Sequence, residues 1–435
     1  MFKEFNKYVL PSVLSMFISS LYAVVDGIFV GRGVGDLALG AVNIVVPLTI
    51  FFFGIASMFA VGGGTLISEN FGHKKIENGV IIFREVFQFL IIISLILSVL
   101  CIFFAKEIVI FLGAKDELIP LSVTYLKYYS IFCIPNIIGI SLGSFIRNDG
   151  NPNLAMIATI SGALTNILFD YIFIFKMDFG IKGAAIATGI GQSLTVFLIM
   201  FHFFFKKGHL SFGKSKFNKT NIEHFVKLGF PSFFTEITFS IIVFCMNMAL
   251  LKIGSKNEIA SFGIINYITT NIYMLLLGLS FGVQPLFSYY FAAKSFKKVS
   301  YFYKISFLSS FFINFISFFF FYKYGYSVIR LFTEDQIIIK ETYVGLILFN
   351  LSFFIIGLNI IQAGYYQAIG KPMDSNIICI LRSFVFLPII IYIFTKYFGL
   401  KGIWLSVLFS ELLSFITWNI YLFIKEYSHK KILLN

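Results

Sequence analysis

The feature that most constrains this chain is its series of long apolar runs, each about as long as a helix that crosses a membrane. A transmembrane helix needs about 20 mainly apolar residues, and twelve such runs follow one another through the 435 residues. Charged residues make up only 13% of the chain, against roughly 25% in an ordinary soluble domain. The composition therefore excludes most soluble enzymes and predicts an all-α membrane protein. The expected spans are 9–30, 43–66, 86–105, 125–146, 154–175, 183–205, 228–251, 260–287, 305–322, 342–368, 375–395 and 402–424.

The chain also contains an internal repeat. Three short segments of the first part recur in the second part, at a spacing of 219 or 220 residues. Each part then holds six expected spans, and an even number of spans returns the chain to the side from which it entered. Both halves therefore enter the membrane from the same side, as parallel repeats related by an axis along the membrane normal do. The matching segments are KYVLPS (7–12) and KLGFPS (227–232), RNDGNP (147–152) and QAIGKP (367–372), and FGIKG (179–183) and FGLKG (398–402).

These observations predict twelve transmembrane helices in two six-helix bundles, which are related by a pseudo-two-fold axis along the membrane normal. We expect an N-terminal bundle over residues 1–205, a cytoplasmic linker over 206–224 and a C-terminal bundle over 225–435. If both termini are cytoplasmic, that side of the membrane holds 21 Lys and Arg residues and the other side holds 13. Because Lys and Arg are enriched in cytoplasmic loops, we expect cytoplasmic termini and a multi-pass protein of a prokaryotic cytoplasmic (inner) membrane.

Two carboxylates stand out in the spans of the first half, where each costs about 2.5–3.5 kcal/mol and usually serves a function. At about 1.5 Å per residue, Asp26 and Asp170 lie roughly 7 and 8 Å below the outer edge of the membrane. Asn166 lies one turn deeper than Asp170 on the same helix face, and Thr188 reaches a similar depth. Such oxygen ligands suit a hard cation, and a carboxylate can instead carry a proton. The alternative is hydrogen bonding that holds helices together.

Two further carboxylates, Glu236 and Glu411, lie in the second half. Counted from the ends of their spans, they are roughly 12 and 14 Å deep and therefore near the middle of a hydrocarbon core of about 30 Å. They could bind the charge of a cationic substrate, or they could be protonated structural residues. Arg382 lies about seven residues into its span, and its long side chain is expected to reach the cytoplasmic surface.

Pro11 lies inside the first span, where its missing N–H should kink the helix that also carries Asp26. No motif for catalysis or for a resident metal accompanies these residues. The five histidines lack HExxH spacing, the four cysteines lack CxxC spacing, and no Gly-Lys-Ser/Thr follows the glycines at 62–64. We therefore expect a protein that is not an enzyme and has no cofactor, with Na⁺ or H⁺ as a coupling ion.

Four segments of the first half read DGIFVGRGVGDLALGAVNIVVPL (26–48), SFIRNDGNPNLAM (144–156), TNILFDYIFIF (165–175) and FGIKGAAIATGIGQ (179–192). They resemble the multidrug and toxic compound extrusion (MATE) family, and the resemblance extends less specifically over nearly the whole chain. It implies two six-helix bundles around a central cleft, and the efflux of cationic, lipophilic compounds in exchange for Na⁺ or H⁺. The resemblance also implies an ion site at Asp26, Asn166, Asp170 and Thr188, and a helix kink at Pro11.

The second half departs from that family's pattern. Some members use a deeper glutamate in the seventh helix and an aspartate in the tenth for Na⁺, whereas Glu236 lies nearer the start of its span and the tenth span holds no acid. A second-half Na⁺ site of that kind is therefore not expected. A flippase for a lipid-linked oligosaccharide would share the fold but should favour a more cationic cleft, and a membrane-embedded transferase would need paired aspartates near the membrane surface. The expected partners are cationic drugs and the lipid bilayer, with no nucleic acid, and the expected state is a monomer.

Overall fold

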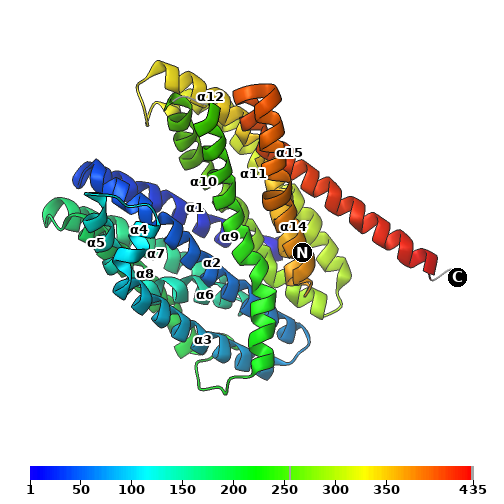
Figure 1. Ribbon diagram of the computed structural model, residues 1–435. Coiled ribbons are helices and arrows are strands. Elements are labelled where there is room, and N and C mark those ends of the chain that lie inside the picture. Colours follow the sequence, from blue (N-terminus) through cyan, green and yellow to red (C-terminus); the bar gives the residue numbers. More distant parts are fainter. Residues whose placement is uncertain (254–255, 433–435) are drawn as a thin grey trace.

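The computed structural model describes residues 1–253 and 256–432, which form helices joined by short loops. Two groups of helices, α1–α8 and α9–α15, are joined by a coil over residues 205–218 (Figure 1). The first group comprises α1 (Phe2–Gly33), α2 (Asp36–Gly72), α3 (Ile76–Phe103), α4 (Ala105–Phe111), α5 (Leu118–Ile131), α6 (Cys133–Asn148), α7 (Pro152–Asp170), the π-helix η1 (Tyr171–Lys176) and α8 (Gly180–Phe204). The second comprises α9 (Lys219–Ile253), α10 (Lys256–Ala292), α11 (Phe296–Ile329), α12 (Gln336–Asn350), α13 (Phe353–Ala368), α14 (Pro372–Ile380), the π-helix η2 (Leu381–Val385) and α15 (Phe386–Ile432).

The described helices account for twelve membrane spans. Ten segments are long and apolar enough to cross a membrane, and α5 and α6, bent by 52° relative to each other, make an eleventh. The longest of the ten, Pro372–Lys425, contains Gly399 with a φ of 58° and a ψ of −138°, so it consists of two helices and the total is twelve. Glycine adopts such a positive φ without a steric penalty. The expected all-α, twelve-helix fold is confirmed.

Local details differ from the spans expected from the sequence. The span expected at 125–146 is interrupted at Phe132, between α5 and α6. Pro135 lies in the first turn of α6 and has no N–H to donate to the last turn of α5, which explains the break. The short helix α4 was not expected, because its seven residues are too few to form a recognisable span. Helix α9 begins at Lys219, inside the stretch expected to be linker.

The two groups touch mainly through α1 against α10 and α2 against α9. Small residues let helix backbones approach closely in such contacts. A methyl group at Gly278 of α10 would lie 2.7 Å from the Cα atom of Val13 in α1, and one at Gly282 would lie 2.7 Å from the Cα atom of Val9. Gly62 of α2 is packed in the same way against the backbone of α9. The contact between the groups therefore depends on the absence of side chains.

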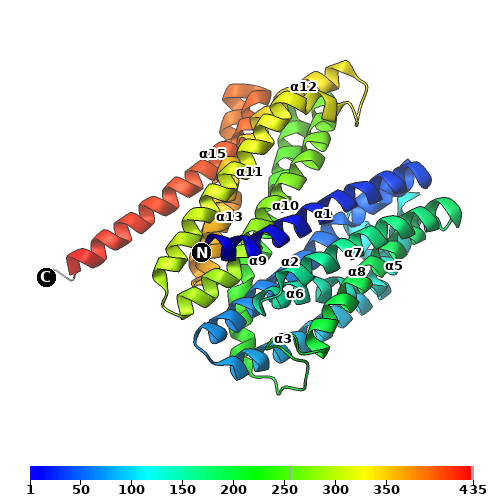
Figure 2. The ribbon, with the colours of Figure 1, turned by 180° about the vertical axis from the view of Figure 1, so that it is seen from behind.

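From this contact the two groups diverge like the arms of a V (Figures 1 and 2). Helix α1 begins at the contact end, where the N-terminus is marked. It stays against α10 as far as Ser20, whose hydroxyl donates to Asn271 Oδ1 at 2.8 Å, and its last turns run away from α10. The 205–218 coil lies at the contact end too, because His209 of the coil lines the same cavity as Tyr8 of α1 and Tyr289 of α10. The arms therefore open on the side opposite the N-terminus and the coil.

Candidate functional site

The structure brings the four polar residues of the first half together from three helices. Helix α1 supplies Asp26, α7 supplies Asn166 and Asp170, and α8 supplies Thr188. The side-chain amide of Asn166 donates to the Thr188 hydroxyl at 3.4 Å, and this hydroxyl donates to the carbonyl of Ala184 at 3.1 Å. The carboxyl groups of Asp26 and Asp170 lie within hydrogen-bonding reach of each other. Such a bond requires one of the two carboxyl groups to carry a proton.

These residues present acceptor oxygens without donors. Apart from a proton shared between the two carboxyl groups, four buried oxygens receive no hydrogen bond, namely Asp26 Oδ1, Asn166 Oδ1 and both carboxylate oxygens of Asp170. Asp170 and Asn166 are 0% and 1% exposed, so bulk water does not solvate them, and buried acceptors without partners are costly. No cluster of three or more His, Cys, Asp or Glu side chains that could hold a metal ion occurs among the described residues. Carboxylate, amide and hydroxyl oxygens fit a proton or a hard cation such as Na⁺ instead.

Aromatic and amide side chains around this site were missed by the sequence reasoning. Tyr22 lies one turn before Asp26 on α1 and accepts a hydrogen bond from Gln192 Nε2 at 3.3 Å. Tyr125 of α5 is buried, and it and Tyr22 both interact electrostatically with the two aspartates. The four-residue spacing of Tyr22 and Asp26 could have indicated the first of these neighbours. Nothing in the sequence indicated Tyr125, which comes from another helix.

Each half contains a short π-helical segment at a charged residue within a membrane span. Segment η1 begins at Tyr171, directly after Asp170, and η2 contains Arg382. A π-helical turn shifts the helix register by one residue and often occurs at functional sites. The side chains beyond such a turn therefore point in directions that regular helical spacing does not predict.

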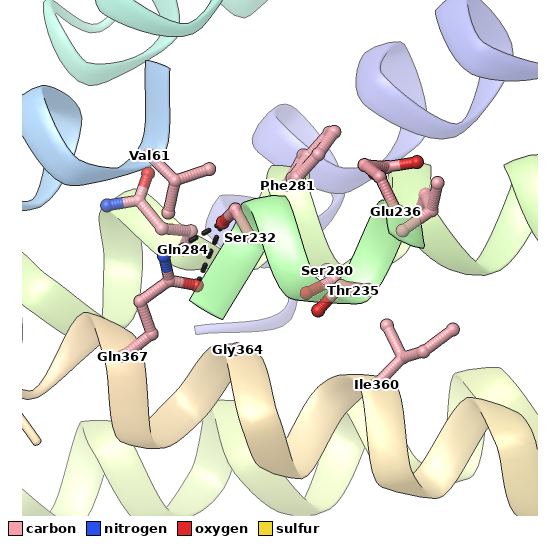
Figure 3. A pocket seen from close by; sticks show the side chains of 11 residues that line it. Val61, Ser232, Thr235, Glu236, Ser280, Phe281, Gln284, Ile360, Gly364 and Gln367 are labelled. Atoms are coloured by element: carbon pink, nitrogen blue, oxygen red, sulfur yellow. Dashed lines mark hydrogen bonds between the residues drawn. The ribbon is translucent and has the colours of Figure 1, made fainter. Parts of the chain in front are cut away.

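In the second half, Glu236 of α9 lines a small pocket between α9, α10 and α13 (Figure 3). Glu236 is 5% exposed, and its Oε1 atom receives no hydrogen bond. Figure 3 shows Glu236 at one end of the pocket and Gln284 and Gln367 at the other. The cavity volume is about 20 Å³, which is room for about one water molecule. Val61 of α2 also lines the pocket, so the pocket borders both halves.

Glu411 is in a different environment, and the expectation for Arg382 was wrong. Arg382 does not reach the surface; it is 1% exposed, and its Nη2 and Nε atoms donate to Glu411 Oε1 at 2.7 and 3.0 Å. Glu411 Oε2 accepts a hydrogen bond from Asn359 Nδ2 at 2.7 Å. Both carboxylate oxygens are thus engaged and the charge is matched within the protein. The structural interpretation of Glu411 is favoured over substrate binding, as an ion-paired carboxylate rather than a protonated one.

Helix α1 continues through Pro11, and the Ser15 hydroxyl donates to the Pro11 carbonyl at 2.7 Å. Pro11 lies in the stretch of α1 that packs on α10, between Val9 and Val13. Pro11, which has no backbone N–H to donate, is therefore part of the contact between the two groups.

Buried hydrogen bonds also cross between the groups at this end. Gln284 Nε2 of α10 donates to the Thr65 hydroxyl of α2 at 3.1 Å, and Gln284 Oε1 accepts from Asn148 Nδ2 at 3.5 Å. Next to them lies a cavity of about 460 Å³, lined by Tyr8 and Tyr289 among others. No sequence pattern indicated this network, because its members are neighbours only in the folded chain.

Comparison with known proteins gives consistent matches along the chain. The MatE family description matches residues 11–172 and 231–393, two stretches that begin 220 residues apart. Over 412 residues the sequence is 26% identical to "Multidrug export protein MepA" of Staphylococcus aureus, covering 94% of this chain and 91% of that protein. The Staphylococcus saprophyticus protein of the same name is 25% identical over the same shares.

Solved structures resemble the whole chain. A MOP superfamily transporter from Pyrococcus furiosus superposes with a TM-score of 0.92 at 22% identity, covering 98% of this chain and 96% of that one. An outward-facing structure described as a multidrug resistance MATE family transporter also gives a TM-score of 0.92 at 22% identity, covering 99% and 96%. These likenesses establish the fold.

Proposed function

Because this chain belongs to the MatE family, we propose that it is a secondary active transporter, which exports cationic, lipophilic compounds in exchange for H⁺ or Na⁺. The observation that carries the proposal is the set of four buried acceptor oxygens at Asp26, Asn166 and Asp170, which have no donor. The similarity to multidrug export proteins supports drugs as the transported compounds.

In this proposal the first-half residues bind the coupling ion. Two carboxyl groups within hydrogen-bonding reach repel each other when both are ionised, and their burial removes the water that would screen them. One proton, or one Na⁺ ion with Asn166 and Thr188 as further ligands, relieves both penalties. The ion enters from the open side of the V. Ion binding can drive transport only if the ion has different affinities for the two arrangements of the helices.

Glu236 is the proposed site of substrate charge recognition in the second half. Its carboxyl group is buried, has an oxygen without a donor and lines a pocket at the contact between the two groups. A cation near an uncompensated carboxylate gains electrostatic energy that is much larger in a water-poor site than in bulk water. Glu411 is not included in this role, because Arg382 already neutralises it.

The proposal also covers the membrane topology and the oligomeric state. We place the protein in a prokaryotic cytoplasmic membrane as a monomer, with cytoplasmic termini, following the distribution of Lys and Arg. The contact end, which holds the N-terminus and the 205–218 coil, then faces the cytoplasm and the V opens outward. Rocking of one bundle against the other, as in other transporters with internal repeats, would give access from the inside.

Transport by the purified protein in proteoliposomes tests the proposal, with Na⁺ and pH gradients imposed independently. We expect one of these gradients to drive ethidium uptake into vesicles of the matching orientation, and a neutral or anionic dye to be moved less. The other gradient serves as the control for membrane leakage. If the protein moves only a lipid-linked sugar, and ethidium does not respond to either gradient, the drug-efflux proposal is wrong and the flippase alternative replaces it.

A further inference from the structure

Glu411 of the second half has a cationic partner, whereas the two aspartates of the first half do not. In the first half, Asp26 and Asp170 lie beside each other with no cationic side chain paired to them among the described residues. In the second half, Glu411 is paired with Arg382 at 2.7 Å and hydrogen-bonded to Asn359 at 2.7 Å. Acid and base are 1% and 0% exposed as side chains, so water screens neither charge.

The internal repeat shows how this difference arises. The 220-residue offset of the RNDGNP segment places Gly162 of α7 at the position of Arg382, and the 219-residue offset of FGIKG places Gln192 of α8 at the position of Glu411. In the first half these positions carry no charge. Gly162 packs against the backbone of Gly191, and Gln192 donates to Tyr22 beside Asp26. Where Gly162 makes a close backbone contact in the first half, Arg382 forms an ion pair in the second half.

We propose that Arg382 is a built-in counter-ion for Glu411, which neutralises this carboxylate so that Glu411 binds no coupling cation. This inference rests on the proposed function. Arg382 acts as a positioning residue, because it holds Glu411 and is not itself exposed to the transported compound. The guanidinium is covalently attached to the chain. Unlike a bound Na⁺ ion or proton, this positive charge therefore cannot dissociate during a transport cycle.

The surroundings of the pair support this assignment. Among the described residues, the other titratable side chains that interact with Arg382 are Tyr273 of α10 and Cys379 of α14, and neither supplies a positive charge. Tyr273 also interacts electrostatically with Glu236, and its hydroxyl donates to the carbonyl of Thr235 at 3.0 Å. The tyrosine therefore neighbours both the Arg382–Glu411 pair and Glu236, which has no ion-pair partner among the described residues.

The test is to remove the counter-ion and ask whether Glu411 acquires a need for an external cation. Arg382→Met keeps an apolar stem of similar length and removes the charge, which leaves a buried carboxylate that only a proton or a cation can neutralise. The variant is made in a background with Asp26→Asn and Asp170→Asn, so that the first half no longer binds ions. The readout is the Tm of the purified protein in mildly alkaline buffer, with NaCl or with choline chloride at equal ionic strength.

The expected result is a Tm of Arg382→Met that rises by several degrees with added Na⁺ or with falling pH, because a bound ion stabilises the folded state. The parent background should show a much smaller response. The matched control is the double change Arg382→Met with Glu411→Gln, which removes the acceptor and should remove the response. A Tm of Arg382→Met that responds to Na⁺ and pH no more than the parent does would overturn the inference.

A second measurement covers the case in which Arg382→Met does not fold. Replacing both members of a buried ion pair by neutral residues is often tolerated, so the double change is made with Asp26 and Asp170 intact. Its uptake of protons or Na⁺ should equal that of the unmodified protein, while Asp26→Asn with Asp170→Asn should lose it. Lost uptake in the double variant would show that the Arg382–Glu411 pair takes part in ion binding and would overturn the counter-ion assignment. Neither readout depends on drug transport, so a failed efflux assay and a failed counter-ion test can be told apart.

Discussion

The contact between α1 and α10 should control which side of the membrane the protein opens to, and Gly278→Ala tests this. The added methyl group would lie 2.7 Å from the Val13 Cα atom and 2.9 Å from the Ser12 carbonyl oxygen. Favourable carbon contacts are at about 3.5–4.0 Å, so the helices must separate by about 1 Å. Both atoms belong to the backbone, which cannot move without the helix. Overpacking of this kind costs typically about 1–3 kcal/mol.

This cost applies only to the arrangement in which the two helices touch. It should therefore lower the ratio of the observed arrangement to the alternative one by about 5- to 150-fold. Distance measurements between spin labels report this ratio. Suitable sites are Leu37 at the start of α2 and Leu331 after α11, which are 53% and 83% exposed, in a protein whose half-buried Cys245 has been replaced. We expect the population with the long distance between labels to fall in Gly278→Ala.

The matched control is Gly263→Ala, in the same helix, where a methyl group would meet no atom within 4 Å. Both changes raise the helix propensity of α10 by the same amount, about 1 kcal/mol, so propensity cancels in the comparison. Equal distance distributions in Gly278→Ala and Gly263→Ala would refute the idea that this glycine contact holds the observed arrangement.

Three further predictions concern charge and topology. Asp26→Asn and Asp170→Asn should each abolish gradient-driven ethidium efflux in proteoliposomes while the protein still inserts, because Asn keeps the shape and removes the ionisable group; wild-type efflux by a well-expressed Asp170→Asn protein would leave only a packing role. Glu236→Gln should weaken the affinity for cationic drugs in a binding assay and leave ion coupling largely intact, and an unchanged affinity would move Glu236 to the structural residues. Reporter fusions after residues 215 and 430 should both be cytoplasmic, and labelling of either point from outside intact cells would contradict this topology.

The sequence predicted the fold class because each step depended on length and hydropathy. Twelve apolar runs and a 220-residue repeat specify twelve helices in two bundles, whatever their side chains touch. Local breaks were harder to predict, since the interruption at Phe132 and the kink at Gly399 lie inside or between apolar runs of ordinary appearance. Depth along a helix also says nothing about the direction in which a side chain points.

Arg382 illustrates that limit best. Its position, seven residues into a span, was compatible with a side chain that reaches the membrane surface. The π-helical turn η2 and the position of Glu411 on α15 decide otherwise, and neither can be read from the local sequence. Asp26 and Asp170 were easier to relate to each other, because they lie at similar depths on helices of the same half. Their function remains a prediction, since the structure shows only that their oxygens lack donors.

Contacts along α1 and α10 connect the proposed ion site with the proposed drug site at Glu236. Asp26 lies on α1 about 20 Å from Val13, the residue that packs on Gly278 of α10, at about 1.5 Å per residue. At that contact, Gly278 and Gly282 flank Ser280, which lines the pocket of Glu236. A movement of α1 would therefore act on α10 at the wall of this pocket. If this path carries the coupling, Asp26→Asn and Gly278→Ala should change drug affinity non-additively in a double-mutant cycle. Effects that add within about 0.5 kcal/mol would show that the two sites act independently.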